Sequence, residues 1–94
     1  MAKPKRSPAA VELGERIRAR RLALGFSQER LAQRSELSWS YVSSVERGER
    51  NVTLHNILRL GHALGVDPPD LIRDLPVPFA TVPPPNDRDP SLAG

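Results

Sequence analysis

The stretch SQERLAQRSELSWSYVSSVERG, residues 27–48, predicts two short helices joined by a tight turn. Serine is preferred immediately before a helix, because its hydroxyl accepts a hydrogen bond from a backbone N–H of the first turn. Ser27 and Ser38 are placed to cap the two helices, and the turn falls at residues 35–37. Four apolar residues at helical spacing are expected to face inward: Leu31, Ala32, Val42 and Val45.

The second of these helices has a polar and aromatic outer face. Since Val42 and Val45 define its inward side, serines remain on the outside together with Trp39 and Tyr41, two of the four aromatic residues of the chain. A helix of this kind fills the major groove of DNA, where its early exposed residues meet the base edges. The pattern favours a recognition helix over two alternatives, a solvated serine face and an aromatic residue in the core.

The segment before this stretch predicts a longer helix that begins at Pro8. Ser7 is its cap, and proline is favoured at the first helical position, where no N–H is needed. Gly25 is expected to end it, since glycine adopts the left-handed conformation that closes many helices. The inward face has spacings of four, four and three residues: Leu13, Ile17, Arg21 and Leu24.

The segment after Gly48 predicts two more helices, which makes the fold class all-α with five helices. Thr53 caps the fourth helix and Gly65 closes it, while a short fifth helix starts within residues 67–70. Five residues of the fourth helix are expected to face inward: Leu54, Ile57, Leu58, Gly61 and Leu64. The short fifth helix carries Leu71 and Ile72.

Composition divides the chain into three parts. Residues 1–7 form a basic flexible arm, residues 8–75 the compact helical domain, and residues 76–94 a proline-rich tail. The tail holds six of the ten prolines and little that can be buried, so it is expected to be extended and disordered.

Positive charge is concentrated at the N-terminal end. The net charge is +3, but residues 1–21 hold seven basic and two acidic residues, and residues 22–94 hold seven basic and nine acidic ones. A basic excess at one end suits a polyanionic partner, and Lys3, Lys5 and Arg6 are candidates to reach along or into a DNA groove. The alternative is a solvated basic surface.

The sequence lacks the residue patterns that are typical of metal-binding proteins, membrane proteins, secreted proteins and enzymes. There is no cysteine, and His55 and His62 have no acidic or cysteine cluster at ligand spacing, so we expect no metal and no cofactor. No apolar run approaches the roughly 20 residues that span a bilayer, and no secretory signal follows the basic start, so a cytoplasmic protein is expected. No nucleophile elbow, phosphate loop or paired-carboxylate motif is present, and we expect no enzyme activity.

In order and spacing, these elements resemble the phage-repressor-like (Xre/Cro-type) helix-turn-helix family. The resemblance covers residues 13–75, and residues 41–54, YVSSVERGERNVTL, are still more similar to the restriction–modification controller proteins. It implies a five-helix repressor-like domain that binds a (pseudo)palindromic operator in duplex DNA as a homodimer and regulates transcription. It rests on Arg21, Gly25-Phe26-Ser27-Gln28, Leu31-Ala32, Tyr41-Val42-Ser43, Glu46-Arg47-Gly48 and Ala63-Leu64-Gly65.

The resemblance also implies roles for single positions. Gln28 matches a glutamine that contacts a DNA phosphate, and Arg21 and Glu46 match an ion pair between the first helix and the end of the third. The remaining matches are base-edge positions at Trp39, Ser40, Ser43 and Ser44, a backbone or base contact at Tyr41, and a loop that grips the DNA backbone through Arg47, Arg50 and Asn51.

Two residues depart from the family pattern. The turn usually has glycine where this chain has Glu36, and a non-glycine residue in the left-handed region costs about 1–2 kcal/mol. Relatives often place Arg, Gln or Lys at the position of Trp39, whose indole has one N–H donor and no acceptor. Three roles stay open for Trp39: packing on a thymine methyl, lying along the sugar–phosphate backbone, or no base contact.

The expected homodimer needs an apolar surface, and the fourth and fifth helices offer one at Leu71, Ile72 and Leu75. The two recognition helices would then enter major grooves about one turn apart, roughly 34 Å. An alternative function is that of an antitoxin-like DNA-binding protein whose proline-rich tail binds a protein partner.

Overall fold

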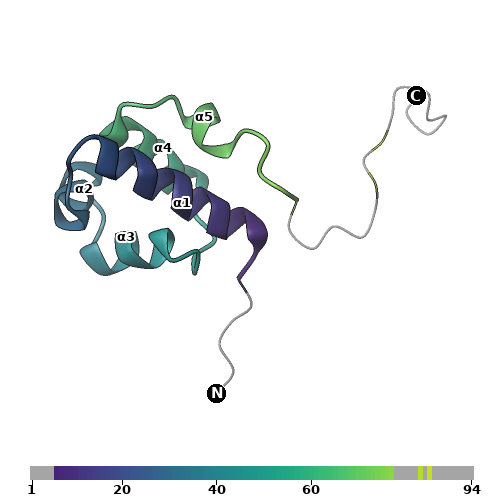
Figure 1. Ribbon diagram of the computed structural model, residues 1–94, viewed down its shortest axis with the longest axis horizontal. Helices are drawn as coiled ribbons and strands as arrows, with labels where there is room; N and C mark the ends of the chain where they lie inside the picture. The colour runs from purple at the N-terminus through teal and green to yellow at the C-terminus, as the bar shows by residue number, and fades with distance from the viewer. Residues whose placement is uncertain (1–5, 78–82, 84, 86–94) are drawn as a thin grey trace, which may run out of the picture.

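The structure, a computed structural model, describes residues 6–77, 83 and 85, and the regular elements of this part are all helical (Figure 1). The predicted all-α, five-helix fold is therefore confirmed. In chain order the helices are α1 (Pro8–Ala23), α2 (Gln28–Ser35), α3 (Trp39–Glu46), α4 (Leu54–Leu64) and α5 (Pro68–Ile72). The expectations for Lys3, Lys5 and almost all of the proline-rich tail lie outside the described residues.

Four helices begin at the predicted caps. The side-chain oxygens of these caps accept hydrogen bonds at 3.0–3.2 Å from the backbone N–H three residues further on. The capping residues are Ser7, Ser27, Ser38 and Thr53. Gly25 and Gly65 follow the ends of α1 and α4 with φ values of 74° and 65°, as the predicted helix ends require. Local signals thus place both ends of most helices.

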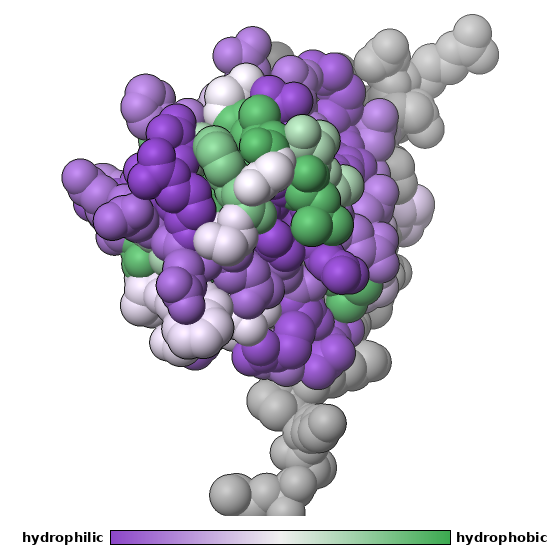
Figure 2. Space-filling view, turned by 60° about the vertical axis from the view of Figure 1, so that its left-hand side comes forward, coloured by the Kyte–Doolittle hydropathy of each residue, from purple (hydrophilic) through white to green (hydrophobic). Residues whose placement is uncertain are grey.

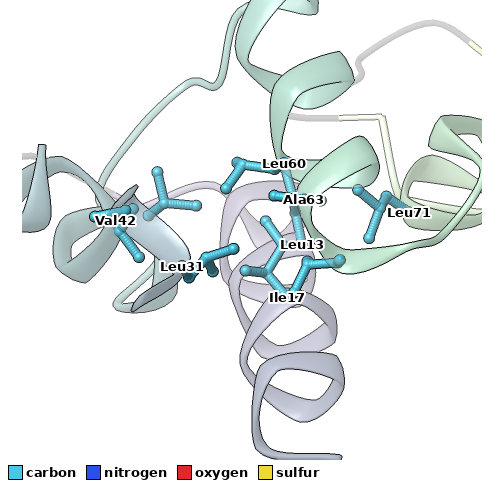
Figure 3. Packing of buried hydrophobic residues seen from close by; sticks show 10 residues of the cluster. Leu13, Ile17, Leu31, Val42, Leu60, Ala63 and Leu71 are labelled. Carbon is cyan, nitrogen blue, oxygen red and sulfur yellow. The ribbon is translucent and has the colours of Figure 1, made fainter. Parts of the chain in front are cut away.

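The core is built from one face of every helix (Figure 3). Full burial of a large aliphatic side chain stabilises a fold by about 1.5–3 kcal/mol, so a small domain depends on each of them. The six largest fully buried side chains are Ile17 of α1, Leu31 of α2, Val42 and Val45 of α3, and Leu60 and Leu64 of α4.

The orientation of α4 differs from the prediction. Leu54 and Leu58 were expected in the core but are 71% and 48% exposed. The buried side of α4 is set by Leu60 and Leu64, and residues two apart in a helix do not share a face, so Leu58 points away from Leu60. Leu54 lies one turn before Leu58 on the same exposed side.

Leu71 and Leu24 also differ from their predicted positions. Leu71 was predicted at a dimer surface, but it is buried in the core, where α5 packs against α1 and α4. Ile72 next to it is 43% exposed, and Leu24 lies on the surface because it follows the last turn of α1. Figure 2 shows one face of the molecule, on which apolar side chains gather within a hydrophilic surround.

Glu36, in the turn between α2 and α3, has the left-handed conformation that the family pattern suggested, with φ 59° and ψ 35°. Its N–H closes α2 on the carbonyls of Ala32 and Gln33. Arg59 of α4 donates a hydrogen bond to the Glu36 carbonyl at 3.4 Å and approaches its carboxylate at 3.8 Å. The turn is therefore strained at one residue and held from α4.

Replacing Glu36 with glycine should raise the free energy of unfolding by about 0.5–1 kcal/mol. Glycine removes the left-handed strain of about 1–2 kcal/mol, and its greater freedom in the unfolded chain offsets part of the gain. Urea unfolding measures the difference. Glu36→Ala is the matched control, because it removes the carboxylate and keeps the strain; an equal gain in both variants would contradict the explanation.

Candidate nucleic-acid interface

The interface is built on α3, which packs against α1 and α2 (Figure 1). One side of α3 is buried and the other faces outward. Val42 and Val45 hold the inward side in the core. Trp39, which is 57% exposed, and Ser40 lie in its first turn on the outside, and Ser43 is half-buried one turn later. A short helix with these exposed residues fits a groove lined with hydrogen-bonding base edges.

Gln28, the first residue of α2, joins both ends of α3. Its Oε1 accepts a hydrogen bond from Nε1 of Trp39 at 3.2 Å, and its Nε2 donates to Oε1 of Glu46 at 3.2 Å. An amide nitrogen carries two hydrogens, so one remains to bond an acceptor outside the protein. The predicted phosphate ligand is thus at the start of a helix, with its side chain held on both sides.

Arg21 and Glu46 form the predicted ion pair, which is almost fully buried. Arg21 Nε donates to Glu46 Oε2 at 2.7 Å and Nη2 to Oε1 at 2.9 Å, with side chains 9% and 3% exposed. A third donor, Nη1, bonds the Phe26 carbonyl at 2.8 Å. The hydrogen bonds to Glu46 raise the pKa of Arg21 above its ordinary value, although burial opposes them. The guanidinium therefore stays charged and ties α1 to the end of α3.

Gly14 of α1 also limits the position of α3, near Glu46, and sequence reasoning missed it. A Cβ atom there would lie 2.4 Å from the Val45 carbonyl oxygen and 2.8 Å from that of Glu46. Only glycine allows α1 and α3 to approach so closely. The available signal was a glycine inside a helical run, between buried Leu13 and Ile17.

A second polar cluster surrounds Tyr41 and Ser44. Ser44 Oγ donates to the Tyr41 carbonyl at 2.7 Å and accepts from Arg50 Nε at 3.0 Å, while the Arg50 guanidinium carbon lies 5.7 Å from the centre of the Tyr41 ring. The Tyr41 hydroxyl accepts from Asn56 Nδ2 of α4 at 3.0 Å. Asn56 is another residue that sequence reasoning missed, because its partner lies 15 positions away.

The placement of Ser44 contradicts its expected contact with base edges. Its residue surface is only 4% exposed, and its hydroxyl bonds a carbonyl of its own helix and Arg50. It lies on the side of α3 that also buries Val45, and a serine inside a helix commonly bonds the carbonyl three or four residues before it. Ser44 is therefore a support for Arg50 and is not a base reader in this structure.

The loop after α3 gathers basic side chains beside one carboxylate. Arg47 donates to Ser43 Oγ and to both carboxylate oxygens of Glu49, and Arg6 pairs with Glu49 at 2.9 Å. Asn51 is exposed in the same loop. The structure therefore brings Arg47, Arg50 and Asn51 to one loop next to α3, and adds Arg6 from the arm.

The described residues hold no group of three or more His, Cys, Asp or Glu side chains placed to bind a metal ion. Within the same ranges, every helix is too short or too polar to cross a bilayer.

Comparison with known proteins gives this arrangement a family. Residues 12–75 match the family described as a helix-turn-helix domain. The chain belongs to the helix-turn-helix family. The predicted resemblance to Xre/Cro-type proteins, and among them to restriction–modification controller proteins, is confirmed by individual relatives.

Three relatives show how far the likeness of this helix-turn-helix protein extends. Control protein C.BamHI of Bacillus amyloliquefaciens is 47% identical over 60 residues, which are 63% of this chain and 74% of that protein. The crystal structure of the restriction-modification controller protein C.AhdI from Aeromonas hydrophila has a TM-score of 0.65 at 53% identity and covers 66% of this chain and 94% of its own. The crystal structure of the P22 c2 repressor protein in complex with synthetic operator 9T has a TM-score of 0.62 at 38% identity, and the match covers 65% of this chain and 92% of that chain.

Replacing Arg21 with methionine should destabilise the domain by about 3–5 kcal/mol, because the buried Glu46 carboxylate loses its counter-charge. Adding Glu46→Leu should restore more than half of the loss, since two apolar residues leave no buried charge. Urea unfolding of the single and double variants gives both values. A double variant as unstable as the single one would show that the pair does not act through charge.

Proposed function

We propose that this protein binds duplex DNA sequence-specifically as a homodimer and regulates transcription from a (pseudo)palindromic operator, as a controller-type regulator. The observation that carries the proposal is the outward side of α3. Gln28 contacts this helix at Trp39 and Glu46, and Arg47 of the following loop contacts it at Ser43. A recognition helix in the major groove needs this arrangement, with readers in the middle and phosphate ligands on its flanks.

Four residues are proposed to contact phosphates. Gln28 has a spare amide hydrogen, and Arg50 is oriented by Ser44 and the Tyr41 ring, so both are held near one geometry before DNA arrives. Phosphate contacts supply much of the affinity of such proteins and make it depend on salt. The proposed set is Gln28, Arg47, Arg50 and Asn51.

Base contacts are proposed for Ser40 and Ser43, with Tyr41 at a backbone or base contact. Ser40 is exposed in the first turn of α3, and Ser43 and Tyr41 are half-buried along the same helix. A serine hydroxyl both donates and accepts, so it can bond several base edges. The sequence preference therefore depends on a few short side chains.

Gln28→Ala and Arg50→Ala should weaken binding to all duplexes alike, and Arg50→Ala should also flatten the dependence of affinity on salt. Ser40→Ala should instead change the preferred site. Selection of bound fragments from the native genome, followed by titration at several salt concentrations, measures both effects. Gln33→Ala is the matched control, an exposed glutamine on α2 that bonds Arg30. An unchanged selected site in Ser40→Ala would refute the base contact.

The dimer surface is proposed on α4, α5 and the segment after α5. Leu54 and Leu58 share the exposed side of α4, and Ile72 and Leu75 line an open groove whose other walls include Ala9, Ala10, Val52 and Ile57. A domain with so small a core gains stability by covering apolar surface in a dimer.

Leu58→Glu should weaken self-association at least tenfold, because it places a charge in the proposed apolar contact. Sedimentation at micromolar concentration, with and without an operator duplex, measures the oligomeric state. Leu22→Glu is the control, since Leu22 is an exposed leucine on α1. A wild-type protein that stays monomeric in both conditions would overturn the homodimer.

Recognition of this kind uses hydrogen bonds and charge, so the proposal includes no catalytic step and no cofactor. The cytoplasm is the proposed location. The antitoxin-like alternative depends on the proline-rich tail, almost all of which lies outside the described residues.

A further inference from the structure

Trp39 is the only tryptophan of the chain and has an unusual place on the surface. It is the first residue of α3, and more than half of its surface is exposed. Its one polar group is nevertheless used, because Nε1–H donates to Oε1 of Gln28 at 3.2 Å. The indole has no other donor or acceptor for a base edge.

The bond from Trp39 determines which way the Gln28 amide points. Oε1 faces the indole donor, and Nε2 faces the Glu46 carboxylate, which is itself paired with Arg21. A flipped amide would set Oε1 against the carboxylate oxygen and its NH₂ group against the indole N–H. Both contacts would then be repulsive, so the observed orientation is the only one of the two that satisfies the neighbours.

This orientation suits an anionic ligand. The oxygen of the amide, which would repel a phosphate, is turned to Trp39 and already hydrogen-bonded. The nitrogen keeps one hydrogen that neither Glu46 nor Trp39 uses. A phosphate at the start of α2 would also meet the free backbone N–H groups of the first helical turn.

We propose that Trp39 is a positioning residue that holds Gln28 ready for a DNA phosphate, and that it does not read a base. The inference rests on the proposed DNA-binding function and deepens it, because it assigns a role to one of the two positions where this chain departs from its family. Trp39 raises affinity because it orders the flexible Gln28 side chain before DNA binds. Ordering one side chain lowers the dissociation constant by about two- to tenfold.

A double-mutant cycle on the full chain tests the proposal. Trp39→Phe keeps an aromatic ring and removes the N–H donor, and Gln28→Ala removes the residue through which it acts. Affinity is measured for the selected operator and for an unrelated duplex of the same length. Trp39→Phe should weaken both by the same two- to tenfold, and should change affinity less than twofold once Gln28 is alanine.

Two outcomes overturn the positioning role while leaving DNA binding intact. One is a loss on the operator alone, which would make Trp39 a base reader. The other is a change in affinity caused by Trp39→Phe that is the same whether residue 28 is glutamine or alanine. An affinity that Trp39→Phe leaves unchanged in both backgrounds is included in this outcome. Thermal unfolding of each variant shows whether a change in DNA affinity comes from a loss of folded protein. Gln33→Ala is the control for an exposed glutamine of α2 outside this contact.

A spectroscopic readout follows the contact without any DNA. A single tryptophan gives a single indole N–H resonance, which should shift upfield in Gln28→Ala, and the Gln28 side-chain amide signals should broaden in Trp39→Phe. Unchanged signals would show that the bond is absent and would overturn the inference. If the wild-type protein binds no duplex, the proposed function and the inference are both wrong. If it binds a duplex but the indole and amide signals do not change in the variants, only the inference is wrong and the proposed function stands.

Discussion

The buried pair of Arg21 and Glu46 determines where the outward helix lies. Both oxygens of the carboxylate meet the guanidinium, one of them also accepts from Gln28, and almost no surface of either side chain is open to water. A charge buried without its partner costs several kcal/mol, so α3 has little freedom to tilt away from α1. Gly14 adds a steric limit at the same place, because α1 and α3 touch through backbone atoms.

Most of the contacts that hold α3 lie at its ends and on its inner side. Glu46 and Gln28 hold one set of contacts, while Tyr41 is bonded to Asn56 of α4 and covered by Arg50. A surface that must match a rigid duplex benefits from side chains that are ordered before contact. Among the residues that the structure describes, the Ser40 hydroxyl has only a long contact with Ser38, at 3.4 Å, and so can bond an external partner.

Sequence reasoning succeeded where the interactions are local. The caps at Ser27 and Ser38 bond a backbone N–H three residues away, so the residue type alone predicts them. The exposed side of Leu58 and the burial of Ser44 were not predicted, because periodicity shows which residues share a face but not which neighbour covers it. The close approach at Gly14 and the bond between Asn56 and Tyr41 depend on how two helices are placed in space. The Arg21–Glu46 pair, 25 residues apart, followed from the family resemblance alone.

Glu36 and Trp39, the two departures from the family pattern, are each held by a hydrogen bond to a residue on another helix. Glu36 keeps its left-handed backbone with Arg59 of α4 bonded over its carbonyl, and Trp39 gives its only donor to Gln28 of α2. Through Gln28, the indole reaches the carboxylate that Arg21 requires for its own burial. Glu46 therefore serves both stability, as the partner of buried Arg21, and recognition, as the partner of Gln28. A change in the buried ion pair will alter the orientation of Gln28, although the pair itself lies beneath the surface that meets DNA.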